Sequence, residues 1–418
     1  MVARAKHKWA FKPGMRAGVF SWKSSAKAIA RLKSARSEIR TVARTDPTTA
    51  AEGVIDLAQR IWPAFEHIDT SSGALGNAVR RTLEDLLPVL VEAPADEKTQ
   101  AKWLERLREA IMDDGVDYLA PIADCFGKIA AYPALMNLHA DRDLDMIEAA
   151  WSDHARYTHV ATGTLTLSCL LEAGRYDDLL ELLDRKKTRL WFDEKFGAEA
   201  LLRQGREADA LARAEELLLD ERRQWGHVEI AQFCERILRS QGREEEAYRH
   251  FGLPSASGNT YLAMWRALVR RYPDRDARCI LEDLIDTHAS KGKWFAAAKT
   301  ARFLDIALEC AAHYDAGPTT LIRASRDLKL KEPSFAMHVA LEAIRHLVQG
   351  RGYEPNPLDI DEAVEHLMVA AKQLGEAQWA LHQLRQIAGS ALSAGPMGER
   401  LARNIAILQA AGREGGHG

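Results

Sequence analysis

The chain has 418 residues, 47% hydrophobic content and a formal net charge of -3, so it is long enough to bury a substantial core. No apolar run approaches the roughly 20 residues that a bilayer-spanning helix needs, and the basic N-terminus lacks the apolar segment of a secretion signal. Ala, Leu, Arg and Glu dominate over alternating Val, Ile and Thr runs, which argues against a sizeable sheet and predicts an all-α fold.

The N-terminal arm, residues 1–45, is strongly basic. Between Met1 and Arg44 there are twelve Lys or Arg residues against one acid, Glu38, which is a local net charge of +11. From Ser24 to Val42, apolar residues recur at helical spacing among exposed cations, which predicts an amphipathic basic helix. The apolar set comprises Ile29, Leu32, Ile39 and Val42.

Three interpretations of this arm remain open. It docks on the acidic repeat region through Ile29, Leu32 and Ile39 and caps the first hairpin, or it binds nucleic acid through residues 1–44, since cations neutralise phosphates and aromatic rings stack on bases. A membrane-surface or organelle-targeting role is the third. The candidate nucleic-acid contacts are Trp9, Trp22, Lys23, Lys27 and Arg31.

A helical region is expected over residues 46–157. Asp46 precedes Pro47, which suits an N-cap followed by the first helical position. A further helix is expected from about Asp96 to a stop near Gly115. This region lacks the turn that recurs later in the chain.

The third region, residues 158–418, repeats a turn made of Gly followed by a cation. The turn occurs at Gly174, Gly205, Gly242 and Gly292, with a weaker copy at Gly375 that lacks the cation. Gly supplies the left-handed residue that ends a helix, and a cation there suits the negative end of the helix dipole. The intervals of 31, 37 and 50 residues between the first four are irregular.

Residues flanking each Gly are apolar at matching offsets, as a structural repeat requires. Five and nine positions after the Gly, the residues are one helical turn apart and face the preceding helix. Nine, five and four positions before the Gly, the pattern recurs on a first helix. Those first-helix sets are Leu165, Cys169 and Leu170; Phe196, Ala200 and Leu201; and Phe233, Ile237 and Leu238.

On these residues the chain resembles the tetratricopeptide repeat family, whose second helix begins Gly-x-Tyr-x-x-Ala with a large residue four positions later. Gly242 to Ala247 and Phe251 match best, and Gly174 is followed by Tyr176. The resemblance implies an irregular α-α superhelix of helical hairpins behind a helical N-terminal region.

The chain also resembles a group of bacterial helical proteins that have no established activity. The shared features are Asp-x-Ser-Ser-Gly at residues 69–73, Phe-Ser-Trp at 20–22, Tyr-Leu at 261–262 with Tyr-Pro at 272–273, and the segment 292–299. This likeness covers nearly the whole chain. It implies a bacterial cytoplasmic protein and assigns no activity.

Helical hairpins predict a scaffold that binds an unknown protein or peptide, because stacked repeats expose long polar faces. No catalytic, cofactor or metal motif is found, and the five separated cysteines suggest core thiols in a reducing cytoplasm. An enzyme with scattered residues in a helical cleft remains a further alternative. The candidate groove comprises Thr164, Ser168, Lys195, Glu199, Gln232, Arg236, Glu282 and Asp286, ten and six positions before the Gly residues.

Overall fold

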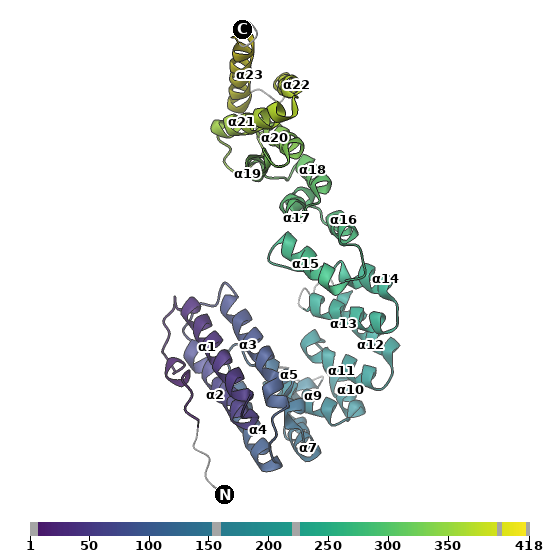
Figure 1. Ribbon diagram of the computed structural model, residues 1–418. Helices are drawn as coiled ribbons and strands as arrows, with labels where there is room; N and C mark the ends of the chain where they lie inside the picture. The colour runs from purple at the N-terminus through teal and green to yellow at the C-terminus, as the bar shows by residue number, and fades with distance from the viewer. Residues whose placement is uncertain (1–6, 153–159, 220–225, 391–394, 415–418) are drawn as a thin grey trace. The chain divides into compact units, whose positions relative to one another are not determined.

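The protein is all-α, as the sequence predicts. A computed structural model describes residues 7–152, 160–219, 226–390 and 395–414, and every regular element within these ranges is a helix (Figure 1). None of the helices in the described ranges is both long and apolar enough to cross a membrane.

The chain forms two compact units, Met1–Ile230 and Ala231–Gly418. These boundaries differ from the three regions expected from the sequence. The basic helix does not stand apart, because α1 packs on α2 and α3, and the first two hairpins, α9 to α12, belong to the same unit as the N-terminal helices. Each unit is described below by itself.

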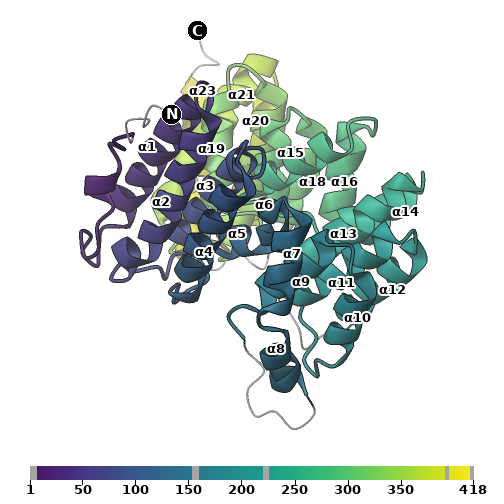
Figure 2. The same cartoon turned by 90° about the horizontal axis from the view of Figure 1, so that it is seen from below.

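In unit 1, a group of N-terminal helices packs together and continues into the helical hairpins. The α1 helix packs on α2 and α3, α2 packs on α4, and α5 and α6 connect this group to α9 (Figure 2). Asp46 caps α2 by accepting a backbone N–H bond, as predicted, and Asp96 caps α4 in the same way. The helices are η1 Lys12–Gly14, α1 Ser25–Ala43, α2 Pro47–Phe65, α3 Ala74–Val91, α4 Glu97–Met112, α5 Ala120–Asp124, α6 Phe126–Ala130, α7 Pro133–Asp141, α8 Leu144–Trp151, α9 Gly163–Glu172, α10 Tyr176–Asp184, α11 Trp191–Arg203 and α12 Glu207–Leu218.

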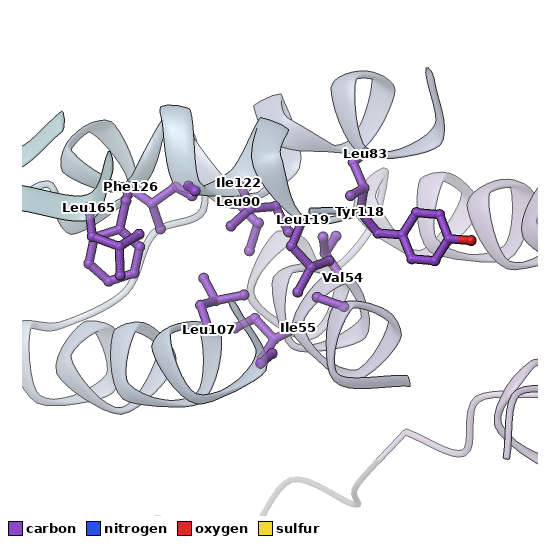
Figure 3. Packing of buried hydrophobic residues seen from close by; sticks show 14 of the residues in the cluster. Val54, Ile55, Leu83, Leu90, Leu107, Tyr118, Leu119, Ile122, Phe126 and Leu165 are labelled. Carbon is purple, nitrogen blue, oxygen red and sulfur yellow. The ribbon is translucent and has the colours of Figure 1, made fainter. Parts of the chain in front are cut away.

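The core of unit 1 is continuous from the N-terminal helices into the hairpins. Figure 3 shows Phe126 of α6 beside Leu165 of α9, and Leu107 of α4 on the opposite side of the same interior. All three side chains are fully buried. Burial of this kind is the main force that holds helices of modest length in place.

The aromatic part of the arm docks on unit 1. Trp9, Phe11 and Phe20 are buried, and the Trp9 ring lies so close to Gly53 that a side chain there would collide with it. The Glu38 carboxylate accepts the backbone N–H groups of residues 10 and 11 at 2.7 and 3.1 Å. Residues 9–20 therefore dock on α2, and α1 packs on α2 and α3, rather than on the first hairpin as the docking interpretation expected.

Unit 2 continues the hairpin arrangement and ends in a cluster of longer helices. The α20 helix packs on α19 and α21, and α23 packs on α21 and α22. The helices are α13 His227–Ser240, which contains the boundary between the units, α14 Glu244–Ala247, the π-helix η2 Tyr248–Gly252, α15 Tyr261–Arg271, α16 Ala277–Thr287, η3 Lys291–Trp294, α17 Phe295–Thr300, α18 Leu304–Ala312, α19 Pro318–Leu328, α20 Pro333–Val348, α21 Pro357–Leu374, α22 Ala377–Ala388 and α23 Pro396–Glu414.

Four of the five predicted Gly turns close helical hairpins. Gly174, Gly205, Gly242 and Gly375 have φ angles between 73° and 75°, the left-handed conformation that Gly adopts without strain. In each, the next residue donates its N–H to the carbonyl five positions back, at 2.8–3.0 Å. This is the Schellman arrangement, which satisfies carbonyl groups at the end of the first helix.

The cation after each of three Gly residues forms an ion pair with the second helix. Arg175 pairs with Asp178 at 2.7 Å, Arg206 with Asp209 at 2.7 Å, and Arg243 with Glu246 at 2.5 Å. Each acid lies three positions further on, in the first turn of the second helix. In addition to the dipole interaction expected from the sequence, each of these cations therefore forms an ion pair with the first turn of the second helix.

The prediction of a hairpin turn at Gly292 is wrong. Gly292 lies buried inside η3, and a side chain there would come within 2.6 Å of Asp315 Oδ1. The turn that joins α17 to α18 uses Arg302 instead, with φ 69° and the same five-residue hydrogen bond from Phe303. Gly350, followed by Arg351, forms another such turn after α20 that the repeat pattern missed.

Replacing Arg302 with Gly is expected to stabilise unit 2. A non-Gly residue in the left-handed region lowers the free energy of unfolding by about 1 kcal/mol. The exposed ion pair of Arg302 with Glu332 at 2.7 Å stabilises the fold by less than that. We expect a gain of about 0.5 kcal/mol in the free energy of unfolding, measured by urea titration. The reverse change, Gly242→Ala, is the control and should destabilise; a loss in both variants would contradict the prediction.

Candidate binding groove

The outward face of α13 is polar, whereas the opposite face is core. Phe233, Ile237 and Leu238 are buried as the repeat predicts. The polar residues recur at intervals of three, four and seven, so they share one face of the helix. They are Gln232, Glu235, Arg236 and Arg239.

This face borders an open cavity of about 480 Å³. The end of α15 contributes Arg271 and the first turn of α14 contributes Glu244, so residues of three helices line the cavity, all within unit 2. We call it the arginine groove. Its lining residues are Gln232, Glu235, Arg236, Arg239, Ser240, Glu244 and Arg271.

Internal contacts hold two of the arginines in place. Arg271 Nη1 donates to Glu235 Oε2 at 2.9 Å, and Glu235 is only 3% exposed. Arg239 Nε donates to Glu244 Oε1 at 3.3 Å, and its guanidinium lies 5.0 Å from the centre of the Tyr272 ring. Burial and the Glu235 carboxylate raise the pKa of the Tyr272 phenol, so it stays neutral. The groove is therefore pre-organised.

The chemistry of the groove favours carboxylate ligands. Three guanidinium groups stand against two carboxylates, a local net charge of +1. A guanidinium carries five N–H donors, and the contacts above leave further donors on Arg239 and Arg271. Arg236 is exposed, with its guanidinium 5.1 Å from the Phe233 ring. Arginines fixed in this way bind planar carboxylates with two parallel hydrogen bonds.

Two of the eight predicted groove residues, Gln232 and Arg236, line this cavity. Four others lie in unit 1 and the last two lie on α16. Ser168 is 1% exposed and its hydroxyl joins Gly127 N–H to the Asp124 carbonyl, so it is not available to a partner. The prediction took only the residues ten and six positions before each Gly, which lie along one edge of the polar face of the helix. It therefore missed Glu235 and Arg239, which lie on the same face at other positions.

The remaining predicted groove residues lie on partly exposed surface. Thr164 is half-buried. Lys195 pairs with Asp124 at 2.6 Å and Glu199 lies 3.6 Å from Arg203. On α16, Glu282 pairs with Arg278 at 3.0 Å and Asp286 with Lys291 at 2.8 Å. The ion pairs of these four charged residues are the ordinary pattern of a solvated helix surface.

The candidate nucleic-acid contacts divide into buried and exposed residues. Trp9 is 3% exposed and does not face a ligand. Trp22 is 63% exposed, and Lys23, Lys27 and Arg31 are all exposed; Trp22 and Lys23 precede α1, whereas Lys27 and Arg31 lie one helical turn apart on it. Lys27 and Arg31 therefore form a short cationic stripe on α1.

Cysteine chemistry and metal binding gain little support. The described residues include no group of three or more His, Cys, Asp or Glu that could hold a metal. Cys169, Cys234 and Cys310 are buried, and burial raises the pKa of Cys169 to about 12. Cys125 is half-buried and Cys279 is exposed, so the prediction of a core thiol is wrong for Cys279.

Comparison with known proteins assigns no family. No family model and no curated protein matches the chain. One solved structure, a circular tandem repeat protein with novel repeat topology and enhanced subunit contact surfaces, is 14% identical over 92% of this chain and 88% of that protein, with a TM-score of 0.16. At that score the likeness carries no argument. The resemblances to tetratricopeptide repeats and to the bacterial group stay predictions.

Proposed function

We propose that this helical-repeat protein binds an acidic segment of a partner protein in the arginine groove, without catalysis. The observation that supports this most directly is the gathering of three guanidinium groups around one open cavity on the outer face of a hairpin. Hairpin repeats commonly use such faces for recognition. A cytoplasmic location belongs to the same proposal.

The mixed charge of the groove favours a peptide over a nucleic acid. Glu244 lines the cavity at the start of α14, and Glu235 lies deeper in it. A polyphosphate backbone would bring a continuous row of negative charges against these carboxylates, which is unfavourable. A peptide offers separate carboxylates for the arginines and N–H donors for Glu244.

Binding assays with matched arginine variants test the proposal. We expect affinity purification from the native host to recover a protein partner with or without nuclease. Arg236→Gln and Arg239→Gln are each expected to weaken binding of the purified partner about tenfold, because a charged hydrogen bond contributes about 1.5–3 kcal/mol. Fluorescence anisotropy with acidic peptides from that partner measures the change.

The neighbouring residue Arg270 provides the control. Arg270 is exposed on the same helix as Arg271 but does not line the groove. Arg270→Gln should therefore leave the affinity unchanged. Equal losses in all three variants would indicate a diffuse charge effect and contradict recognition by the groove, as would a partner that disappears after nuclease treatment.

A second candidate function, nucleic-acid binding, is favoured by the cationic stripe on α1. Lys27→Gln together with Arg31→Gln is expected to reduce the gel shift of mixed DNA and RNA fragments at low salt about tenfold. Lys33→Gln is the control, because Lys33 is exposed on another face of α1. The absence of any shift with the wild-type chain at low salt would contradict this function.

A further inference from the structure

A second cavity of unit 2, separate from the arginine groove, has walls of three different chemistries. It has a volume of about 260 Å³ and lies among α15, η3, α17, α19 and the segment just before α19. No residue of the arginine groove lines it. Its lining residues are Tyr261, Gly292, Lys293, Phe295, Ala296, Asp315, Gly317, Thr320 and Leu321.

The negative wall is Asp315, whose carboxylate is only half satisfied. Oδ1 accepts the Gly292 N–H at 2.9 Å. Oδ2 is shielded from solvent and has no hydrogen-bond partner among the described residues. A carboxylate with one unpaired, solvent-shielded oxygen costs free energy, and a cationic group placed beside this carboxylate in the cavity would offset part of that cost. An ammonium group is the donor that best matches a carboxylate.

The positive wall is made by Lys293 and the start of α19. Lys293 is exposed and carries no ion pair among the described residues. Thr320 lies in the first turn of α19, where the helix dipole favours negative charge and the hydroxyl adds a donor. A carboxylate placed here would meet a full positive charge and a hydroxyl.

The third wall is apolar and held rigidly. The Tyr261 ring lies 4.8 Å from the fully buried Trp294 ring, centre to centre, and Phe295 stacks on Phe335 at 6.3 Å. Together with Leu321, Tyr261 and Phe295 present carbon surface to the cavity. A ligand with an apolar portion would be desolvated against it.

We propose that this cavity binds a small zwitterion of the amino-acid class. Lys293 and Asp315 give the lining a net charge of zero, so a singly charged ligand would satisfy one wall and be repelled by the other. An amino acid instead places its ammonium group at Asp315, its carboxylate at Lys293 and Thr320, and its side chain on Tyr261 and Phe295. The volume is below that of drug-sized sites and suits a ligand of this size.

Isothermal titration of the full chain tests this proposal with three related probes. L-leucine carries both charges, isoamylamine lacks the carboxylate and 4-methylpentanoate lacks the ammonium group. We expect L-leucine to bind at least tenfold more tightly than either analogue. Failure of L-leucine to bind, or equal binding of either analogue, would overturn the proposal.

Two variants locate the binding. Asp315→Asn keeps an acceptor for the Gly292 N–H while it removes the charge, so the fold is expected to persist. Lys293→Met keeps the aliphatic stem. Each is expected to weaken L-leucine binding at least tenfold, whereas Asp274→Asn and Lys331→Met, two exposed residues outside the cavity, should not change it. Unchanged affinity in both cavity variants would place the ligand elsewhere and overturn the assignment.

The two sites of unit 2 can be told apart. Arg236→Gln is expected to leave L-leucine binding unchanged, because Arg236 lines only the arginine groove. Loss of L-leucine binding in this variant would contradict an independent second site. The proposal of a zwitterion site can therefore hold or fail independently of the proposal that the arginine groove binds a peptide.

Discussion

Replacing Gly127 with Ala is expected to destabilise unit 1 by about 3 kcal/mol or more. Gly127 lies in α6, and a side-chain carbon there would come within 2.2 Å of the Ser168 carbonyl oxygen of α9. Because the obstacle is backbone, it cannot move aside as a side-chain end would, and overpacking against it forces the helices apart. The Gly127 N–H bond to Ser168 Oγ at 3.0 Å would be lost as well.

Urea titration followed by circular dichroism measures the loss, and hydrogen exchange assigns it to α6 and α9. Gly76→Ala is the matched control, since Gly76 lies in α3 with no atom within 4 Å of an added side-chain carbon. That change should stabilise by up to about 1 kcal/mol, because Ala favours helix over Gly. Similar stability of the two variants would contradict the close approach of α6 to α9.

Replacing Glu194 with Gln is expected to cost about 2–3 kcal/mol of the free energy of unfolding. Glu194 of α11 is 1% exposed and accepts from Arg189 Nε at 3.0 Å and from Arg213 Nε at 2.6 Å. Removing its charge leaves two cations facing a neutral group. Both arginines reach solvent in part, which keeps the expected cost below that of a fully buried pair.

Glu216→Gln is the control for this network. Glu216 pairs with the same Arg189 at 2.5 Å but is 65% exposed, so its loss should cost less than about 1 kcal/mol. Urea titration of both variants gives the comparison. Equal effects would show that Glu194 contributes no more than a surface ion pair.

The hairpin architecture could be predicted because its determinants are local. Leu165 and Leu170 lie before Gly174, and Leu179 and Leu183 lie after it, within two short helices, so their spacing alone indicates that they face each other. At Gly292 the same reasoning gave a wrong prediction. A Gly is also required where two backbones approach closely, and that contact with residues 315–316 is remote in sequence.

The candidate site could be predicted only in part for a related reason. Gln232 and Arg236 belong to the repeat pattern of a single helix, so an offset rule located them. Arg271 reaches the same cavity from α15, which the repeat pattern does not place. The cavity around Asp315 combines three separate segments, and its residues have no common periodicity in the sequence.

The ion pairs that follow the Gly turns also explain why the repeat length can vary. Each turn is completed within about nine residues, from the carbonyl that receives the hydrogen bond to the acid that pairs with the arginine. None of these interactions depends on the length of the helices on either side of the turn. Hairpin arms of different length can therefore share the same turn, which agrees with the unequal intervals between Gly174, Gly205 and Gly242.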